Sequence, residues 1–299
     1  MVSMSLLQKK TTLVHHITYM GLMAAINLLF IILATYTQYL MFLLILILPF
    51  ASAIVSYYCL KRYYIIYAVA TLGLCLIFNN FADTIFYIVP ALASGFVIGL
   101  LIEKKMHPFW MILSTTIINA ALTYAFIPLI NVIIHDDIVK LTLKLFNLDD
   151  FHYRTELVYV SVFVMSLIQC SLTIFILLSD AKKIGMEINT RITSLAPYII
   201  GLEVAVIGAL SFALFFLPLA FIFLAISACF AAFLVVDLMA KKKLYVYLMM
   251  ALAIVLSMLL FAILYTRIIK PYSFLLFAIF PLSIGIVSFV NNYLIIKER

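Results

Sequence analysis

Four polar side chains inside apolar runs are the residues of this sequence that could do chemistry. Asn27, Asn119 and Gln169 fall near the middle of three such runs, and Glu203 lies about two helical turns into a fourth. A polar group in hydrocarbon needs a partner or a hydrated cavity, so each is a candidate ligand-binding residue. A carboxamide can donate and accept hydrogen bonds, and a carboxylate can bind a cation or carry a proton. The alternative is that the carboxamides bond one another across helices and that Glu203 lies at a helix contact or at the membrane interface.

The runs that hold these residues are typical of a helical membrane protein. The chain has 299 residues, of which 68% are apolar and 10% charged, and its mean hydropathy is +1.27. Soluble domains are about half apolar and about a quarter charged. The runs are about 20 residues long and do not alternate with period two, which favours transmembrane helices over a barrel. The sequence therefore predicts an all-α, polytopic helical membrane protein.

The apolar runs divide into about ten expected spans. The stretch 195–240 is too long for one span and right for two, and Pro218 marks the expected turn because proline disrupts helical hydrogen bonding. The expected spans cover residues 15–36, 39–60, 63–79, 84–102, 108–134, 157–179, 196–216, 218–240, 244–266 and 272–295.

Basic residues orient these spans. With the N-terminus inside, about 14 of the 19 Lys and Arg residues fall in inner gaps and about 5 in outer gaps. Both termini are therefore expected in the cytoplasm. The net charge of +7 follows from the same bias, and no soluble basic face indicates a nucleic-acid partner. The expected surroundings are the lipid bilayer.

Two parts are expected along the chain. Residues 1–180 would form a six-helix bundle and residues 181–299 a four-helix part. Between the fifth and sixth spans, apolar residues recur at helical spacing near 135–155, among charged residues. This segment predicts an amphipathic helix on the outer surface or over a cavity, or a connector packed on the bundle.

Small residues recur on two helix faces. Ala91, Gly95 and Gly99 are four residues apart in the fourth span, and the first span carries a shorter version. Small side chains let another helix approach closely, either inside the protein or on a docking partner. In the first span, the small residues are Gly21, Ala24 and Ala25.

The tyrosines around the second inner gap are expected at the membrane interface. They are Tyr57, Tyr58, Tyr63 and Tyr64.

Motifs of soluble enzymes do not occur in the sequence. It contains no Gly-rich phosphate loop, no HExxH and no nucleophile elbow. The four cysteines lie far apart and lack metal-binding spacing, so buried free thiols are expected. We assign no catalytic residue, no metal and no cofactor from the sequence.

Short segments resemble two related families. Residues 19–26, which read Tyr-Met-Gly-Leu-Met-Ala-Ala-Ile, resemble the first helix of substrate-binding (S) components of energy-coupling-factor transporters. The segments 48–61, 89–105 and 280–299 are similar to the YybS-like family of uncharacterised bacterial membrane proteins, whose N-terminal part is related to S components.

The resemblance implies a location, a partner and a function. It implies a multi-pass protein of the bacterial cell membrane, with a first half that captures a vitamin or metal ion from outside. It also implies docking through Gly21, Ala24 and Ala25 on a transmembrane coupling protein driven by two ATPases, with Asn119 and Gln169 as ligand candidates. About four extra spans, 196–295, depart from the S components. We therefore expect binding and translocation of a small polar solute; the alternative is a non-transporting membrane scaffold.

Overall fold

The structure, a computed structural model, describes most of the chain. The described residues are 12–36, 41–78, 81–137, 139–140, 154–186, 195–213, 215–240, 243–265 and 276–297. Within the expected amphipathic segment near 135–155, residues 138 and 141–153 lie outside the described residues.

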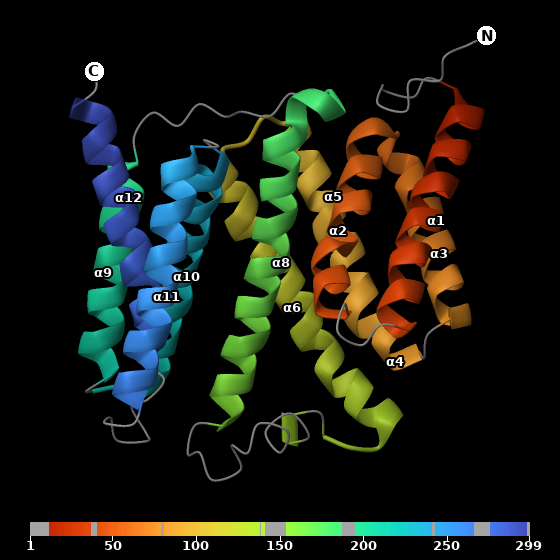
Figure 1. The fold of residues 1–299 in the computed structure, drawn as a ribbon. Helices are drawn as coiled ribbons and strands as arrows, with labels where there is room; N and C mark the ends of the chain where they lie inside the picture. The colour runs from red at the N-terminus through yellow and green to blue at the C-terminus, as the bar shows by residue number, and fades with distance from the viewer. Residues whose placement is uncertain are drawn as a thin grey trace. The chain divides into compact units, whose positions relative to one another are not determined.

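Helices make up the regular structure of the described residues (Figure 1). In chain order they are α1 (Leu13–Tyr36), α2 (Met41–Tyr58), α3 (Lys61–Phe78), α4 (Phe81–Asp83), the π-helix η2 (Thr84–Ile88), α5 (Val89–Glu103), α6 (Pro108–Ile134), α8 (Arg154–Ile184), α9 (Ala196–Ala213), α10 (Leu217–Ala240), α11 (Leu244–Tyr265) and α12 (Ile279–Lys297).

Nine helical segments in the described residues are long and apolar enough to cross a membrane. They correspond to nine of the ten expected spans. The remaining span, 39–60, coincides with α2, which has 18 residues but is not among the nine. The protein is therefore a multi-pass membrane protein, and the expected total of ten spans stays a prediction. The expected division of 195–240 is confirmed, because α9 ends at Ala213 and Pro218 lies in the first turn of α10.

The chain divides into two compact units. The first unit comprises Met1–Ile138 and Met165–Thr190, and the second comprises Val139–Val164 and Arg191–Arg299. The first unit thus holds α1 to α6 and the larger part of α8, and the second holds α9 to α12.

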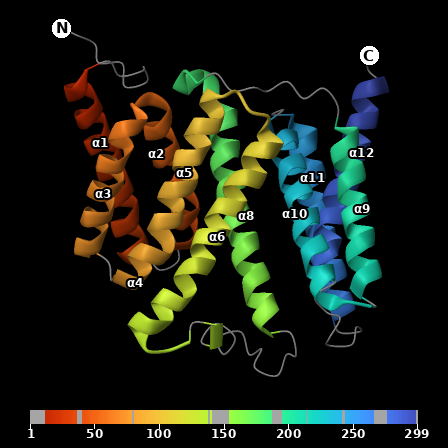
Figure 2. The ribbon, with the colours of Figure 1, turned by 180° about the vertical axis from the view of Figure 1, so that it is seen from behind.

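Close packing of α2 on α5 forms the centre of the first unit. A Cβ atom on Gly95 would lie 2.4 Å from Ser52 Cβ and 2.5 Å from the Pro49 carbonyl oxygen. One turn later, a Cβ atom on Gly99 would lie 2.5 Å from Ser56 Cβ. The two backbones therefore approach so closely that only glycine fits on α5. Around this pair, α1 packs on α2 and α3, and α6 packs on α5 (Figure 2).

Contacts between helix termini show which connections share one end of the first unit. Lys61 Nζ, at the start of α3, lies 2.9 Å from Glu103 Oε2 at the end of α5. The His16 ring, near the start of α1, lies 5.3 Å from the Tyr63 ring. The α2–α3 and α5–α6 connections therefore lie at the same end, as the expected inner gaps require. We call it the basic end, because Lys61, Arg62, Lys104 and Lys105 gather there.

Local signals set the boundaries of α5 and α6. The π-helix η2 precedes α5, and Pro90 lies in the first turn of α5, where the N–H that proline lacks has no partner within the helix. At the start of α6, the His107 side chain accepts a hydrogen bond from the backbone N–H of Phe109 at 3.2 Å, and Pro108 occupies the first turn. α6 ends at His135, whose φ of 57° is left-handed.

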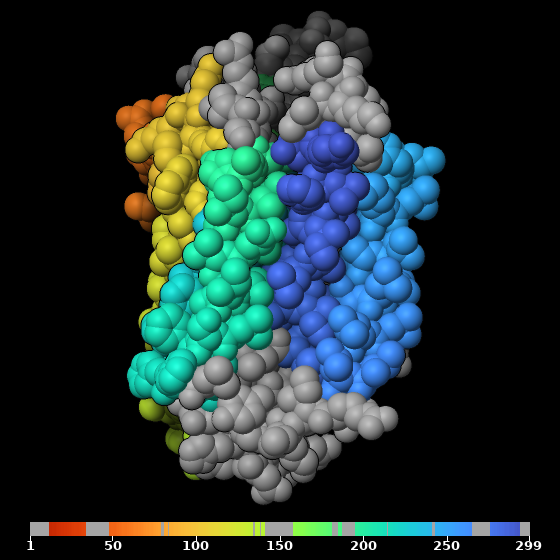
Figure 3. All heavy atoms as spheres, turned by 90° about the vertical axis from the view of Figure 1, so that its left-hand side faces the viewer, coloured from red at the N-terminus to blue at the C-terminus, as the bar shows by residue number. Residues whose placement is uncertain are grey.

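Aromatic rings of α10 pack on two glycines of α9 in the second unit. A Cβ atom on Gly201 would lie 2.7 Å from the Phe230 ring, and one on Gly208 would lie 2.6 Å from the Phe223 ring. These contacts hold α9 against α10. On the face shown in Figure 3, α12 lies between α9 and α11. In the second unit, α9 and α10 therefore pack through phenylalanine rings that lie over glycines. In the first unit, by contrast, α2 and α5 pack with their backbones in close contact.

Candidate functional site

The two central carboxamides of the first unit bond each other. Asn119 Nδ2, on α6, donates to Gln169 Oε1, on α8, at 2.7 Å. Asn119 Nδ2 also lies 3.4 Å from Ser94 Oγ on α5, and Ser166 Oγ donates to Asn119 Oδ1 at 3.4 Å. The thiol of Cys170 lies 3.8 Å from the same amide nitrogen. All five residues are buried, so they form one polar cluster that joins three helices.

A second polar cluster lies between α1 and α3. Asn27 Nδ2 donates to Tyr67 Oη at 2.9 Å, and Thr71 follows Tyr67 one turn along α3. Asn27, Tyr67 and Thr71 have at most 2% of their surface exposed. Within the described part of the chain, Asn27 Oδ1 makes no hydrogen bond, and Thr71 Oγ1 makes none of good geometry, although the Tyr67 hydroxyl lies close to it. A buried polar atom without a partner costs about 1–3 kcal/mol, so this cluster has unused capacity for a polar ligand.

Tyrosine and serine side chains connect α2, α3 and α5 near these clusters. Tyr64 Oη donates to the Leu92 carbonyl oxygen at 2.7 Å, and Ser52 Oγ donates to the same oxygen at 3.1 Å. The two hydroxyls also bond each other. The Tyr64 ring packs on the Phe96 ring at 4.5 Å. The Tyr64 side chain therefore points into the unit and is buried, and its expected depth at the membrane interface stays a prediction.

Sequence reasoning missed Tyr64, Tyr67 and Thr71 as polar interior residues. Their side chains recur at intervals of three and four residues, which places them on one face of α3. That periodicity is the signal that could have found them. It was hidden because tyrosines near a basic gap are also typical of the membrane interface.

Glu203 belongs to neither polar cluster, because both clusters lie in the first unit and Glu203 lies in the second. It belongs to α9 of the second unit, and its side chain is exposed beside exposed Ile200, Val204 and Ile207. Asn27, Asn119 and Gln169 all belong to the first unit. A site built within the first unit therefore uses the three carboxamides and not Glu203.

The two small-residue faces differ in what covers them. Ala91, Gly95 and Gly99 are buried, and the two glycines pack against α2 of the same unit. On α1, Ala24 is buried, whereas Gly21 and Ala25 are exposed and a Cβ atom on Gly21 would meet nothing within 4 Å. The α5 face is thus filled within the chain, and a docking surface can be based only on the α1 face.

Metal-binding groups do not cluster in the described residues. No group of three or more His, Cys, Asp or Glu side chains there could hold a metal ion. Cys59, Cys75, Cys170 and Cys229 are buried free thiols, as expected.

No protein-family model, no curated protein and no solved structure matches this chain. The resemblance to S components and to the YybS-like family therefore stays a prediction from short sequence segments.

Proposed function

We propose that this multi-pass membrane protein binds a small polar solute inside its first unit and passes it across the membrane. The observation that carries the proposal is that the buried oxygen Asn27 Oδ1 lacks a hydrogen-bond partner among the described residues, with Thr71 Oγ1 in the same cluster engaged only by the nearby Tyr67 hydroxyl. In a lipid-immersed unit, water is scarce and polar groups are costly, so such atoms are typical of a substrate path. A solute with hydrogen-bond donors would satisfy both oxygens.

The distribution of buried polar groups supports the first unit as the binding unit. Most of the buried polar side chains lie there, including Asn27, Asn119, Gln169 and a series of Ser and Thr hydroxyls. A carboxamide pair can exchange its mutual bond for bonds to a ligand, since each amide both donates and accepts. In the proposal, the Asn119–Gln169 bond closes the site when no solute is bound.

A partner would supply the energy, because the sequence has no nucleotide-binding motif of its own. The exposed Gly21 and Ala25 on α1 offer a notch for a partner helix. Together with the S-component resemblance, this supports a transmembrane coupling protein with ATPases as the partner, in a bacterial cell membrane. The second unit would then be an addition to the binding unit.

The test measures ligand-dependent stability of the purified full-length protein. A panel of water-soluble vitamins is added, and the melting temperature is recorded for each compound. We expect one member of the panel to raise the melting temperature, and Asn27→Ala and Asn119→Ala to abolish that rise. Asn291→Ala is the matched control, because Asn291 lies in the second unit but is equally buried, with Oδ1 accepting from Tyr245 Oη at 3.0 Å and Nδ2 without a hydrogen bond among the described residues.

Two results would contradict the assignment. If Asn27→Ala and Asn119→Ala keep the full stabilisation, the carboxamides do not line the site. If Asn291→Ala abolishes the stabilisation as they do, the effect comes from general loss of packing.

A membrane scaffold is the second candidate function. The direct Asn119–Gln169 bond of 2.7 Å favours it, because a carboxamide pair that is satisfied internally can serve structure alone. In that case Gly21→Leu should release a membrane partner that copurifies with the native chain, while the uptake of vitamins by cells stays unchanged. Loss of vitamin uptake in Gly21→Leu cells would instead favour transport.

A further inference from the structure

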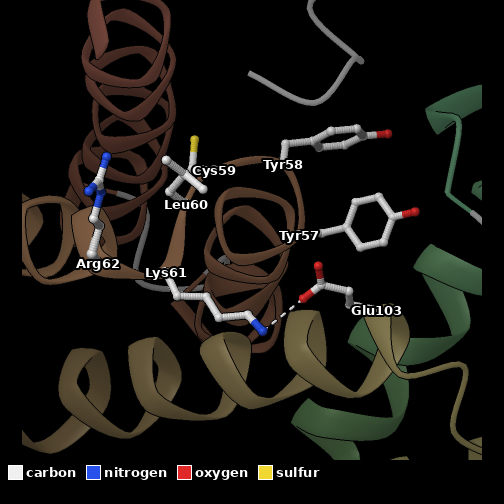
Figure 4. A pocket seen from close by; sticks show the side chains of 7 residues that line it. All are labelled: Tyr57, Tyr58, Cys59, Leu60, Lys61, Arg62 and Glu103. Atoms are coloured by element: carbon white, nitrogen blue, oxygen red, sulfur yellow. Dashed lines mark ion pairs between the residues drawn. The ribbon is translucent and has the colours of Figure 1, made fainter. Parts of the chain in front are cut away.

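A cleft opens at the basic end of the first unit, between the termini of three helices. It has a volume of about 660 Å³ and is lined by Tyr57, Tyr58, Cys59, Leu60, Lys61, Arg62 and Glu103 (Figure 4). These residues come from the end of α2, the start of α3 and the end of α5. Ligand pockets are on the order of 300–1,000 Å³, so the cleft is large enough for a small ligand or a lipid headgroup.

Packed aromatic rings support the wall of the cleft. The Tyr57 and Tyr58 rings meet edge to face at 5.0 Å, and Tyr58 also meets the Tyr19 ring of α1 at 6.3 Å. Tyr58 has 3% of its surface exposed. The wall is therefore built into the unit and is not a surface loop.

Positive charge dominates the lining. Lys61 and Arg62 contribute two cations against the single carboxylate of Glu103. The Arg62 guanidinium lies 4.7 Å above the Tyr63 ring, and no carboxylate pairs with it among the described residues. A guanidinium presents several N–H donors in a plane, which suits the oxygens of a phosphate. The cleft therefore favours an anion.

The Lys61–Glu103 ion pair can yield to such an anion. Its two side chains have 52% and 36% of their surface exposed. An ion pair this exposed contributes little net stability, because water and salt screen it. A phosphate that enters the cleft can therefore take over the Lys61 ammonium at small cost.

Apolar surface continues from the cleft along α3. Leu60, just before α3, is exposed, as are Ile65, Ile66 and Val69 on α3 itself. In a multi-pass membrane protein this surface faces hydrocarbon. A ligand with both a phosphate and acyl chains would use the cations and the apolar surface together, whereas a soluble phosphate would use the cations alone.

We propose that the cleft at the basic end binds the phosphate headgroup of an anionic phospholipid, with the acyl chains along exposed α3. In Figure 4 the Lys61 side chain points toward Glu103 and the Arg62 side chain points the other way, so the phosphate would take Lys61 from Glu103 and turn the exposed Arg62 from the Tyr63 ring into the cleft. The basic end is the end expected in the cytoplasm, where anionic lipids are concentrated. The bound lipid would join α2, α3 and α5 at their termini. This inference does not depend on the proposed solute site.

The test is native mass spectrometry of the full-length protein released from a non-ionic detergent. The protein is titrated separately with phosphatidylglycerol, phosphatidylcholine and glycerol 3-phosphate. We expect phosphatidylglycerol to bind at least about tenfold more tightly than the other two, since it alone offers both charge and chains. Arg62→Gln should weaken phosphatidylglycerol binding about tenfold, and Glu103→Gln should strengthen it several-fold because it frees Lys61.

Lys104→Gln is the matched control. Lys104 is exposed at the same end and carries the same charge, but it does not line the cleft. Its loss should change binding by less than about twofold, since the exposed charge acts only at a distance. The Glu103→Gln arm keeps the test decisive even if Arg62→Gln fails to fold.

Four results would overturn the proposal. Equal weakening in Lys104→Gln and Arg62→Gln would mean general surface attraction, and equal binding of phosphatidylcholine would remove the role of net charge. Equal binding of glycerol 3-phosphate would make the cleft a site for soluble phosphates. Unchanged or weaker phosphatidylglycerol binding in Glu103→Gln would exclude the exchange at Lys61.

Discussion

Replacing Gly95 by alanine should destabilise the protein strongly. The new Cβ atom would lie 2.4 Å from Ser52 Cβ and 2.5 Å from the Pro49 carbonyl oxygen. Both atoms belong to or adjoin the α2 backbone, so they cannot move aside as a flexible side-chain end could. Overpacking of this kind costs about 1–3 kcal/mol, and the upper part of that range applies here. The gain in helix propensity from glycine to alanine is about 1 kcal/mol. The net loss is therefore about 2 kcal/mol.

The melting temperature of the purified full-length protein measures this loss. A thiol-reactive dye suits the assay because all four cysteines are buried in the folded protein. A loss of 2 kcal/mol corresponds to a fall of roughly 3 °C for a chain of 299 residues, since the unfolding entropy is about 2.1 cal/mol/K per residue. Gly73→Ala is the matched control in the same unit, because a Cβ atom there would meet nothing within 4 Å. We expect Gly73→Ala to leave the melting temperature unchanged or to raise it slightly.

An unchanged melting temperature in Gly95→Ala would refute the reasoning. That result would mean that α2 and α5 are not in backbone contact at Gly95. A fall in both variants by the same amount would mean that the α3 face at Gly73 is covered in the folded protein.

Three further predictions concern the polar clusters and the orientation. Tyr67→Phe should lower the melting temperature more than Tyr64→Phe. It leaves the Asn27 carboxamide without the one partner that it has among the described residues, at about 1–3 kcal/mol, whereas the Leu92 carbonyl keeps Ser52. The reverse order would contradict the assigned bonds. Asn119→Leu should cost about 1 kcal/mol through the lost bond to Gln169, and unchanged thermal stability would show that the cluster is not structural. Lys104→Cys should react with a membrane-impermeant maleimide only after cells are opened, whereas Phe81→Cys should react in intact cells. The reason is that the two positions lie at opposite ends of the span 84–103. Labelling of Lys104→Cys in intact cells would reverse the predicted orientation.

The architecture could be predicted from the sequence because the bilayer constrains helices so strongly. An apolar run of about 20 residues can satisfy its backbone in lipid only as a helix. The expected spans 84–102 and 108–134 therefore nearly coincide with the observed helices. Helix ends were less predictable: α8 runs from Arg154 to Ile184, beyond the expected 157–179, because charged ends can extend past hydrocarbon as helix.

The candidate site was predictable only in part. The burial of Asn27, Asn119 and Gln169 follows from their depth in apolar runs, since an exposed amide there would face lipid. Which groups these amides meet did not follow, because the partners Tyr67 and Ser94 lie 40 and 25 residues away in the chain.

The sequence by itself determined that this is a helical membrane protein, where its helices run and which end is basic, because those properties depend on local hydropathy and charge. The tertiary structure alone decided which small-residue face is filled: Gly95 and Gly99 pack on α2, while Gly21 remains open. It also decided that Asn119 meets Gln169 and that Glu203 belongs to another unit. The physical reason is that pairing between helices depends on the shapes of both surfaces, and one helix's sequence specifies only one of them.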